Sequence, residues 1–250
     1  MNKDIEIISN INPELLESDP ELTSILDNFL SKQVLKESVL SDRERLLVTI
    51  ACLVANQSSE LYEKMVKHSL DIGVTPVEIK EILYQSLAYI GLSKTYELLD
   101  KTNEIFIEKN IKLPLPSQAT VKYEDRLNKG YNIQIRNFGK DFIDNNIENT
   151  PEGQKHLWDF ISSYAFGDFY TRNGLSDEDR ELISFTFILS LRGCENQLRI
   201  HTKGNLEIGN NIEKLVSVVT VLIPYIGFPR THNALAIINE VYDKLKNGSE

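Results

Sequence analysis

The most constraining feature of this sequence is that its second half repeats its first. Gly73 and Gly209 each follow an acid and an isoleucine, and Gly91 and Gly227 each follow a tyrosine and an isoleucine. Both pairs of glycines lie 136 residues apart, so the spacing within each half is the same. Because a repeated spacing of helix-ending glycines indicates internal duplication, we expect this 250-residue chain to contain two copies of one domain.

The pattern within each half predicts helices. Ser41 and Glu44 have the spacing of a capping box, and they precede a run at 46–55 that is apolar on nearly every side. Such a run is typical of a helix at the centre of a bundle. Amphipathic segments joined by short breaks follow, and we find no convincing strand pattern, so we expect an all-α antiparallel bundle.

A linker is expected where the helical pattern stops. Pro114, Pro116 and Ser117 interrupt it between the two halves. We therefore predict a first repeat at 1–113 and a second repeat at 114–250.

Composition narrows the class of protein. The net charge of −10 argues against nucleic acid and anionic membranes as partners, since both attract clustered Lys and Arg. The start at 1–6 is polar and does not resemble a signal peptide, and no apolar run is long enough to span a membrane. Two cysteines, Cys52 and Cys194, are too few for a disulfide framework. We expect a cytoplasmic protein.

One stretch of the second half combines reactive side chains. Cys194 and His201 are seven residues apart, close to two helical turns, which would put them on a common helix face as a nucleophile and its base. The alternative is that Cys194 is a small core residue and His201 a structural hydrogen-bonding partner.

The ordered motifs of the second half resemble the carboxymuconolactone decarboxylase family, whose fold is the alkylhydroperoxidase D-like helical bundle. The resemblance covers 123–245, and 25–105 is similar more weakly. It implies a duplicated alkylhydroperoxidase D-like fold. The matching segments are 165–175 (an aromatic-Gly pair, then Arg-x-Gly-Leu), 179–182, 197–201 (similar to Glu-Leu-x-x-His), 225–229 (similar to Tyr-x-Gly-x-Pro) and 233–234.

The alkylhydroperoxidase D-like branch implies a peroxiredoxin-type activity. That branch uses Cys-x-x-Cys-x-x-x-His with an upstream Glu, and Cys194, His201 and Glu181 match its first thiol, base and acid. Gln197 stands where the resolving thiol would be, so an oxidised Cys194 would need an external thiol or Cys52. Cys52 lies in an apolar run, which favours an inert core thiol.

The decarboxylase branch implies a lyase acting on a small carboxylated lactone. Arg172 and Arg199 are the candidate carboxylate clamps, since guanidinium binds carboxylate in a bidentate manner. His201 is the candidate proton donor. Gln197 replaces the family's Glu before Leu-x-x-His, and it cannot transfer protons. Tyr225 and His232 are further candidates for the substrate pocket.

The two halves differ in their site residues. Counting by 136 residues, Met65 stands opposite His201, so we expect the second half alone to retain a site. The first half, with Glu78 and Glu81, then serves either as scaffold or as the source of an acid across the repeat interface.

The reaction class stays open among a lyase, a thiol peroxidase and a non-catalytic ligand-binding protein. No metal-ligand spacing or phosphate-binding loop occurs, so we expect no metal and no cofactor. The expected partner is a small-molecule substrate. Family members form rings, which implies a homo-oligomer, and a duplicated chain implies a trimer in place of a hexamer.

Overall fold

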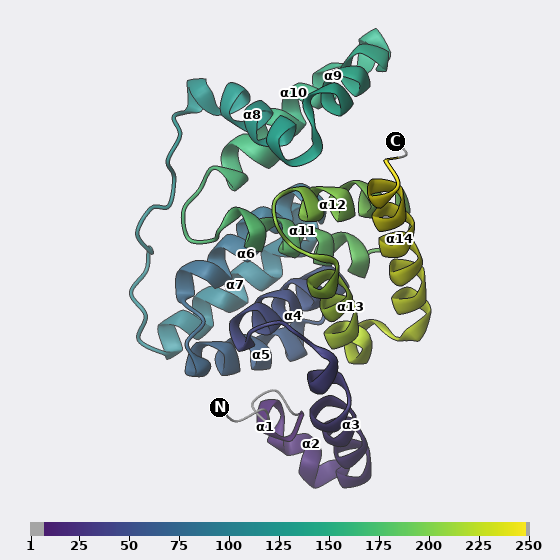
Figure 1. Ribbon diagram of the computed structural model, residues 1–250. Helices are drawn as coiled ribbons and strands as arrows, with labels where there is room; N and C mark the ends of the chain where they lie inside the picture. The colour runs from purple at the N-terminus through teal and green to yellow at the C-terminus, as the bar shows by residue number, and fades with distance from the viewer. Residues whose placement is uncertain (1–7, 249–250) are drawn as a thin grey trace.

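The computed structural model describes residues 8–248, and within this range every regular element is a helix. The expectation of an all-α bundle is confirmed. Figure 1 shows a helical body flanked by a short N-terminal helical group and a projecting helical arm. The elements in chain order are α1 (Ile8–Ile11), α2 (Pro13–Ser18), α3 (Pro20–Lys32), the 3₁₀ turn η1 (Val34–Glu37), α4 (Asp42–Asn56), α5 (Ser59–Ile72), α6 (Pro76–Tyr89), α7 (Leu92–Glu108), the 3₁₀ turn η2 (Tyr123–Asp125), α8 (Arg126–Phe138), α9 (Lys140–Asn149), the 3₁₀ turn η3 (Glu152–Gln154), α10 (His156–Phe160), the π-helical segment η4 (Ile161–Tyr170), α11 (Asp177–Ser190), α12 (Glu195–Glu207), α13 (Ile212–Ile226) and α14 (Phe228–Lys246).

The duplication is visible as two matching sets of four helices, α4–α7 and α11–α14. Both sets open with a complete capping box, on Ser41 for α4 and on Ser176 for α11. These serines are 135 residues apart, one fewer than the later glycines. At Gly73 and Gly209 the chain takes the left-handed conformation that ends α5 and the last turn of α12.

The two sets share their hydrophobic cores. The first core, built mainly from α4–α7, also takes in Ile183 and Phe187 of α11. The second, built mainly from α11–α14, takes in Val48 and Cys52 of α4. Because α4 and α11 pack against each other at the centre of the body, each repeat completes the core of the other.

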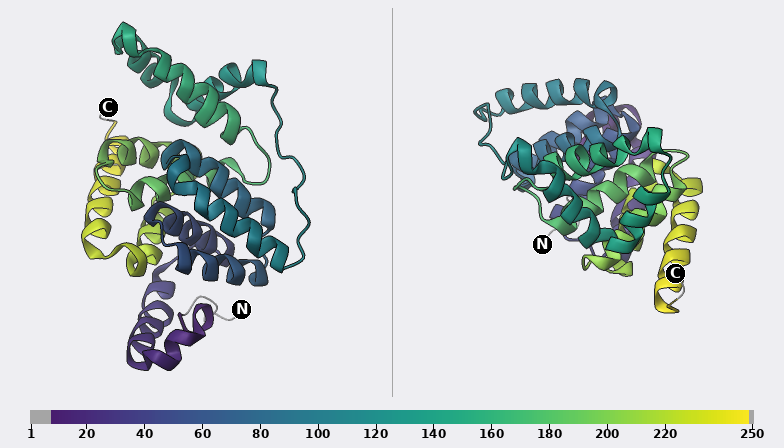
Figure 2. Two further views of the ribbon diagram at one scale, coloured as in Figure 1. Left: turned by 180° about the vertical axis from the view of Figure 1, so that it is seen from behind. Right: turned by 90° about the horizontal axis from the view of Figure 1, so that it is seen from above.

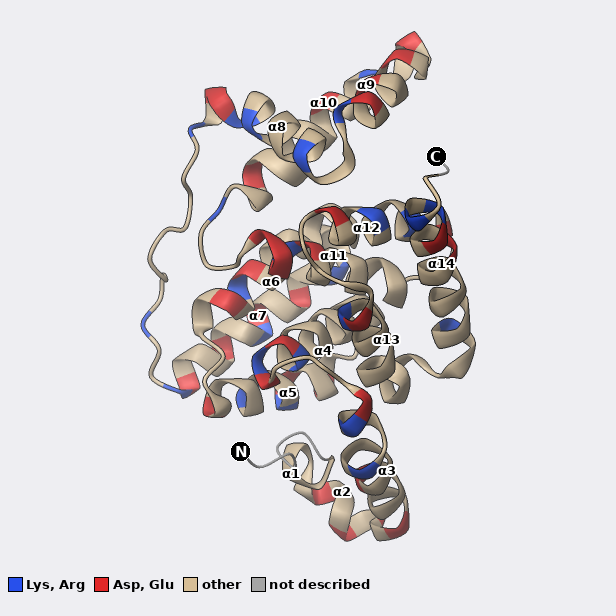
Figure 3. Ribbon diagram, in the orientation of Figure 1, with Lys and Arg blue, Asp and Glu red and all other residues tan. Residues whose placement is uncertain are grey.

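No helix in residues 8–248 is both long and apolar enough to cross a membrane. The polar start at 1–6, on which the cytoplasmic expectation partly rests, lies outside the described residues. Figure 3 shows acidic and basic residues mixed along the helices that face the viewer.

The arm consists of α8, α9, α10 and η4, and it is joined to α7 by an extended linker that runs along the side of the body (Figures 1 and 2). Its two main helical pieces, α8 and η4, pack closely because glycines lie at the contact. A Cβ on Gly130 would come within 1.7 Å of the Ser162 carbonyl oxygen, and one on Gly167 within 2.2 Å of the Arg126 carbonyl oxygen. The arm is therefore held at a backbone separation that only glycine allows.

We predict that Gly130→Ala destabilises the protein by about 3 kcal/mol, because its methyl group overpacks a rigid backbone contact. In an open helix the same change would be stabilising, since alanine is the better helix former. Gly153→Ala is the matched control, as a Cβ there meets no atom within 4 Å. Urea unfolding measures both, and a Gly130→Ala midpoint at or above that of the wild type would contradict the prediction.

Candidate functional site

One face of α6 carries polar side chains into the interface between the repeats. Glu81, Gln85 and Tyr89 recur every four residues, which places them in a row along the helix. Glu81 and Gln85 are almost completely buried. Since buried polar groups must be paired, this row fixes where the second repeat can place its own polar side chains.

Glu81 binds two arginines of the second repeat. Its carboxylate accepts hydrogen bonds from Arg172 Nε at 3.0 Å and from Arg180 Nη2 at 3.1 Å, and Arg172 Nη2 lies 2.9 Å from Glu81 Oε1. Arg180 is fully buried and also donates to the carbonyl oxygens of Arg172 and Asn173. The first repeat thus supplies an acid across the repeat interface, which was one of the two alternatives derived from the sequence.

A chain of hydrogen bonds continues from this ion pair toward the end of α6. Gln85 accepts from Arg180 Nη1 at 3.1 Å and donates to Ser184 Oγ at 2.8 Å. Ser184 Oγ shares a hydrogen bond of 2.5 Å with the Tyr170 hydroxyl, which is 2.9 Å from the Tyr89 hydroxyl. Burial raises the pKa of both tyrosines above its usual value, and the charge of Glu181 raises it further. The phenols therefore remain protonated.

Glu181 and His201 form a buried pair beside these tyrosines. His201 Nδ1 lies 2.8 Å from Glu181 Oε2, and Asn137 Nδ2 donates to Glu181 Oε1 at 3.1 Å. Because a carboxylate can only accept, Nδ1 carries the hydrogen and the other ring nitrogen, Nε2, is left for a different partner. Glu181 is fully buried, whereas the His201 side chain keeps 10% of its exposure.

Two aromatic rings hold the imidazole in place. The rings of Tyr89 and Phe138 meet it edge to face, with centroid separations of 5.5 and 5.3 Å. Tyr89 belongs to the first repeat and Phe138 to the arm, so three parts of the chain position His201. Such packing and hydrogen bonding are what a proton-transferring histidine needs.

Cys194 lies apart from this pair. Helix α12 begins at Glu195, so Cys194 is the residue that precedes it, and within residues 8–248 no hydrogen bond joins its thiol to His201. Cys194 lines a separate groove of about 390 Å³ together with Arg192 and Arg230. Gln197 is exposed to solvent.

The remaining candidates from the sequence also lie away from His201. Arg199 pairs with Glu240 of α14 at 2.9 Å. Tyr225 is partly buried against both main cores, and His232 is exposed beside the ring of Phe228. Arg172, by contrast, reaches the polar interface through Glu81.

Cys52 is a core thiol, as its apolar surroundings predict. It is fully buried, and burial raises its pKa to about 11. No cluster of His, Cys, Asp or Glu suited to a metal ion occurs in the part of the chain that the structure describes.

Several residues of the site were not predicted from the sequence. Gln85, Tyr89 and Ser184 carry a signal that could have found them, because they are polar positions on the inner faces of two otherwise apolar helices. Asn137 and Tyr170 carry no such signal, because they reach the site through the folding of the arm.

The fold and this inter-repeat site define an all-α protein built from two related helical units. The model of the carboxymuconolactone decarboxylase family matches it twice, over residues 20–103 and 157–240. The chain therefore belongs to the carboxymuconolactone decarboxylase family, in a tandem form. It is also 26% identical over 122 residues to the 4-carboxymuconolactone decarboxylase of Acinetobacter baylyi, a match that covers 49% of this chain and 90% of the relative.

We predict that Glu81→Ala destabilises the protein by about 3–5 kcal/mol, because it leaves two arginine side chains without their buried counter-charge. Glu240→Ala, which removes an exposed ion pair, should leave the unfolding midpoint nearly unchanged. Urea unfolding of both variants makes the comparison. Equal midpoints for the two variants would contradict the importance of the inter-repeat pair.

Proposed function

We propose that this protein is a carboxy-lyase for a small carboxylated lactone or a related acid, with His201 as the proton-transferring residue. The observation that carries the proposal is the buried hydrogen bond from His201 Nδ1 to Glu181. A fixed tautomer leaves Nε2 as the atom that exchanges a proton with substrate. The relative from Acinetobacter baylyi, named as a 4-carboxymuconolactone decarboxylase, supports the reaction class.

The proposed step is simple in its balance. The bond between the substrate carbon and its carboxylate breaks, carbon dioxide leaves, and the electron pair stays with the carbon skeleton. Protonated His201 delivers a proton from Nε2 to that carbon, and solvent returns a proton to the imidazole. Glu181 and Asn137 hold the ring through this exchange, so they are positioning residues.

The arginines enter this proposal unequally. Arg172 donates to Glu81, and Arg199 pairs with Glu240 on the other face of α12. We propose Arg172 as the residue that fixes the inter-repeat wall beside the site. A substrate carboxylate would reach Arg199 only after displacing Glu240.

A thiol peroxidase is the second candidate, and one observation favours it. Cys194 is partly exposed at the start of α12, in a groove that two arginines line, and such surroundings stabilise a thiolate. His201 is engaged with Glu181, however, and Cys52 is buried, so neither a neighbouring base nor an accessible second thiol supports a complete cycle.

Activity measurements on 4-carboxymuconolactone should separate these candidates. We expect His201→Gln to lower kcat roughly 10²- to 10⁴-fold, the usual contribution of general acid–base catalysis. Cys194→Ser and the exposed control His232→Gln should retain the wild-type rate. Loss of turnover in Cys194→Ser with retention in His201→Gln would overturn the lyase proposal in favour of thiol chemistry. No turnover by the wild type would leave the ligand-binding function.

We also propose a trimeric assembly, supported by an apolar stripe on the arm. Leu157, Phe160, Ile161 and Tyr164 recur at helical spacing along α10 and η4, and all four are exposed. A row of this kind usually marks an interface. Sedimentation equilibrium should give three times the chain mass, and Phe160→Glu should shift the protein to smaller species. A wild-type monomer would contradict this proposal.

A further inference from the structure

A second cavity lies beneath the linker, away from the His201 pair. It measures about 740 Å³ and is enclosed by α6, α7, the linker at 113–118 and Arg172. This volume falls in the range of small-molecule sites. The linker residues lie outside both segments that match the family model, so this wall is particular to the tandem chain.

The unusual feature of the cavity is Lys80. Its side chain lines the cavity but only 6% of the residue is exposed, and its ammonium donates one hydrogen bond, to Asn103 Oδ1 at 2.5 Å. The ring of Phe106 lies 5.7 Å from Nζ. Within residues 8–248 no carboxylate lies within 4.0 Å of this ammonium, so a buried cation with three donors is left with one hydrogen-bonding partner. Burying a charge in this way is costly unless something else pairs with it.

The charge around the cavity favours an anion. Of its lining residues, Lys80 and Arg172 are cationic and Glu81 is anionic. Glu81 is already shared between Arg172 and Arg180, so it is not free to neutralise Lys80. Burial lowers the pKa of Lys80 below its usual value, and the more distant Asp100 only partly opposes this effect. A positively charged lining is notable in a protein of net charge −10.

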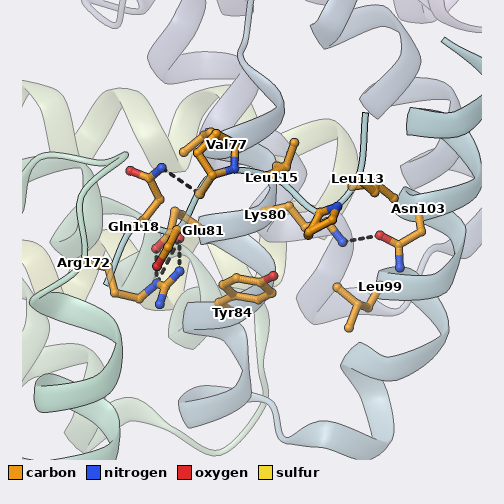
Figure 4. Close-up of a pocket in the computed structure, with 13 residues that line it drawn as sticks. Val77, Lys80, Glu81, Tyr84, Leu99, Asn103, Leu113, Leu115, Gln118 and Arg172 are labelled. Atoms are coloured by element: carbon orange, nitrogen blue, oxygen red, sulfur yellow. Dashed lines mark hydrogen bonds and ion pairs between the residues drawn. The ribbon is translucent and has the colours of Figure 1, made fainter. Parts of the chain in front are cut away.

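The rest of the lining is apolar or neutral. Figure 4 shows the Lys80–Asn103 pair and the Arg172–Glu81 pair on opposite sides, with Tyr84 between them. The apolar lining comes from four side chains, Val77, Leu99, Leu113 and Leu115. We propose that this cavity binds a small organic carboxylate, whose charged group pairs with Lys80 and whose hydrocarbon body packs against these side chains.

The linker is anchored as a wall of this site. The Gln118 carbonyl oxygen accepts a hydrogen bond from the Asn173 amide at 2.9 Å, and Thr120 Oγ1 donates to the Thr171 carbonyl oxygen at 2.5 Å. These bonds attach the linker beside Arg172. Glu181 and His201 are absent from the lining, so the proposed binding is independent of the proposed lyase activity.

Isothermal titration calorimetry of the full chain with octanoate tests the proposal. We expect one octanoate per chain, and Lys80→Met should weaken binding roughly 10- to 100-fold, since a charged hydrogen bond is lost while the packing volume is kept. Lys94→Met is the matched control, because Lys94 is an exposed lysine of α7 outside the cavity. Octanamide, which has the same shape without the charge, should bind as weakly to the wild type as octanoate binds to Lys80→Met.

Two further variants keep the test decisive. Leu115→Trp should block the cavity and abolish octanoate binding even if Lys80→Met folds poorly. His201→Gln should bind octanoate like the wild type. Absence of octanoate binding, equal binding of octanamide, unchanged binding by Lys80→Met or loss of binding in His201→Gln would each overturn the proposal.

Discussion

The structure depends on the pairing of Glu81 with Arg172 and Arg180 across the repeat interface. All three side chains are largely or fully buried, and a buried charge without its counter-charge would cost several kcal/mol. The pairing therefore fixes how α6 lies against α11. From that contact the same face of α6 places Gln85 and Tyr89, and through them the hydroxyl network beside His201.

Duplication has allowed the two halves to divide their roles. Counted from the capping serines, Leu46 in α4 stands where Glu181 stands in α11, and Met65 stands opposite His201. Both apolar residues belong to the first core, so the first repeat has exchanged the polar pair for packing. It still contributes to the surviving site, because Tyr89 contacts the imidazole and Glu81 holds the arginines. Neither half contains the whole arrangement.

Local signals predicted much of this fold, while contacts between distant segments were beyond them. The capping box at Ser41 and the terminating glycines depend on neighbouring residues, so a single sequence reveals them. Cys194 and His201 have helical spacing, but the helix begins one residue after Cys194, which leaves the thiol at its end. Asn137 joins the site because glycines let the arm pack tightly, and no local pattern encodes that contact.

The central claim is that Glu181 holds His201 with Nε2 free for proton transfer. Nitrogen-15 NMR of histidine-labelled protein reads the hydrogen position directly, with His201→Gln identifying the resonances. We expect the neutral ring to carry its hydrogen on Nδ1 in the wild type, and to lose this preference in Glu181→Leu, which introduces the residue found at position 46. A wild-type ring with its hydrogen on Nε2, or a ring unaffected by Glu181→Leu, would contradict the account.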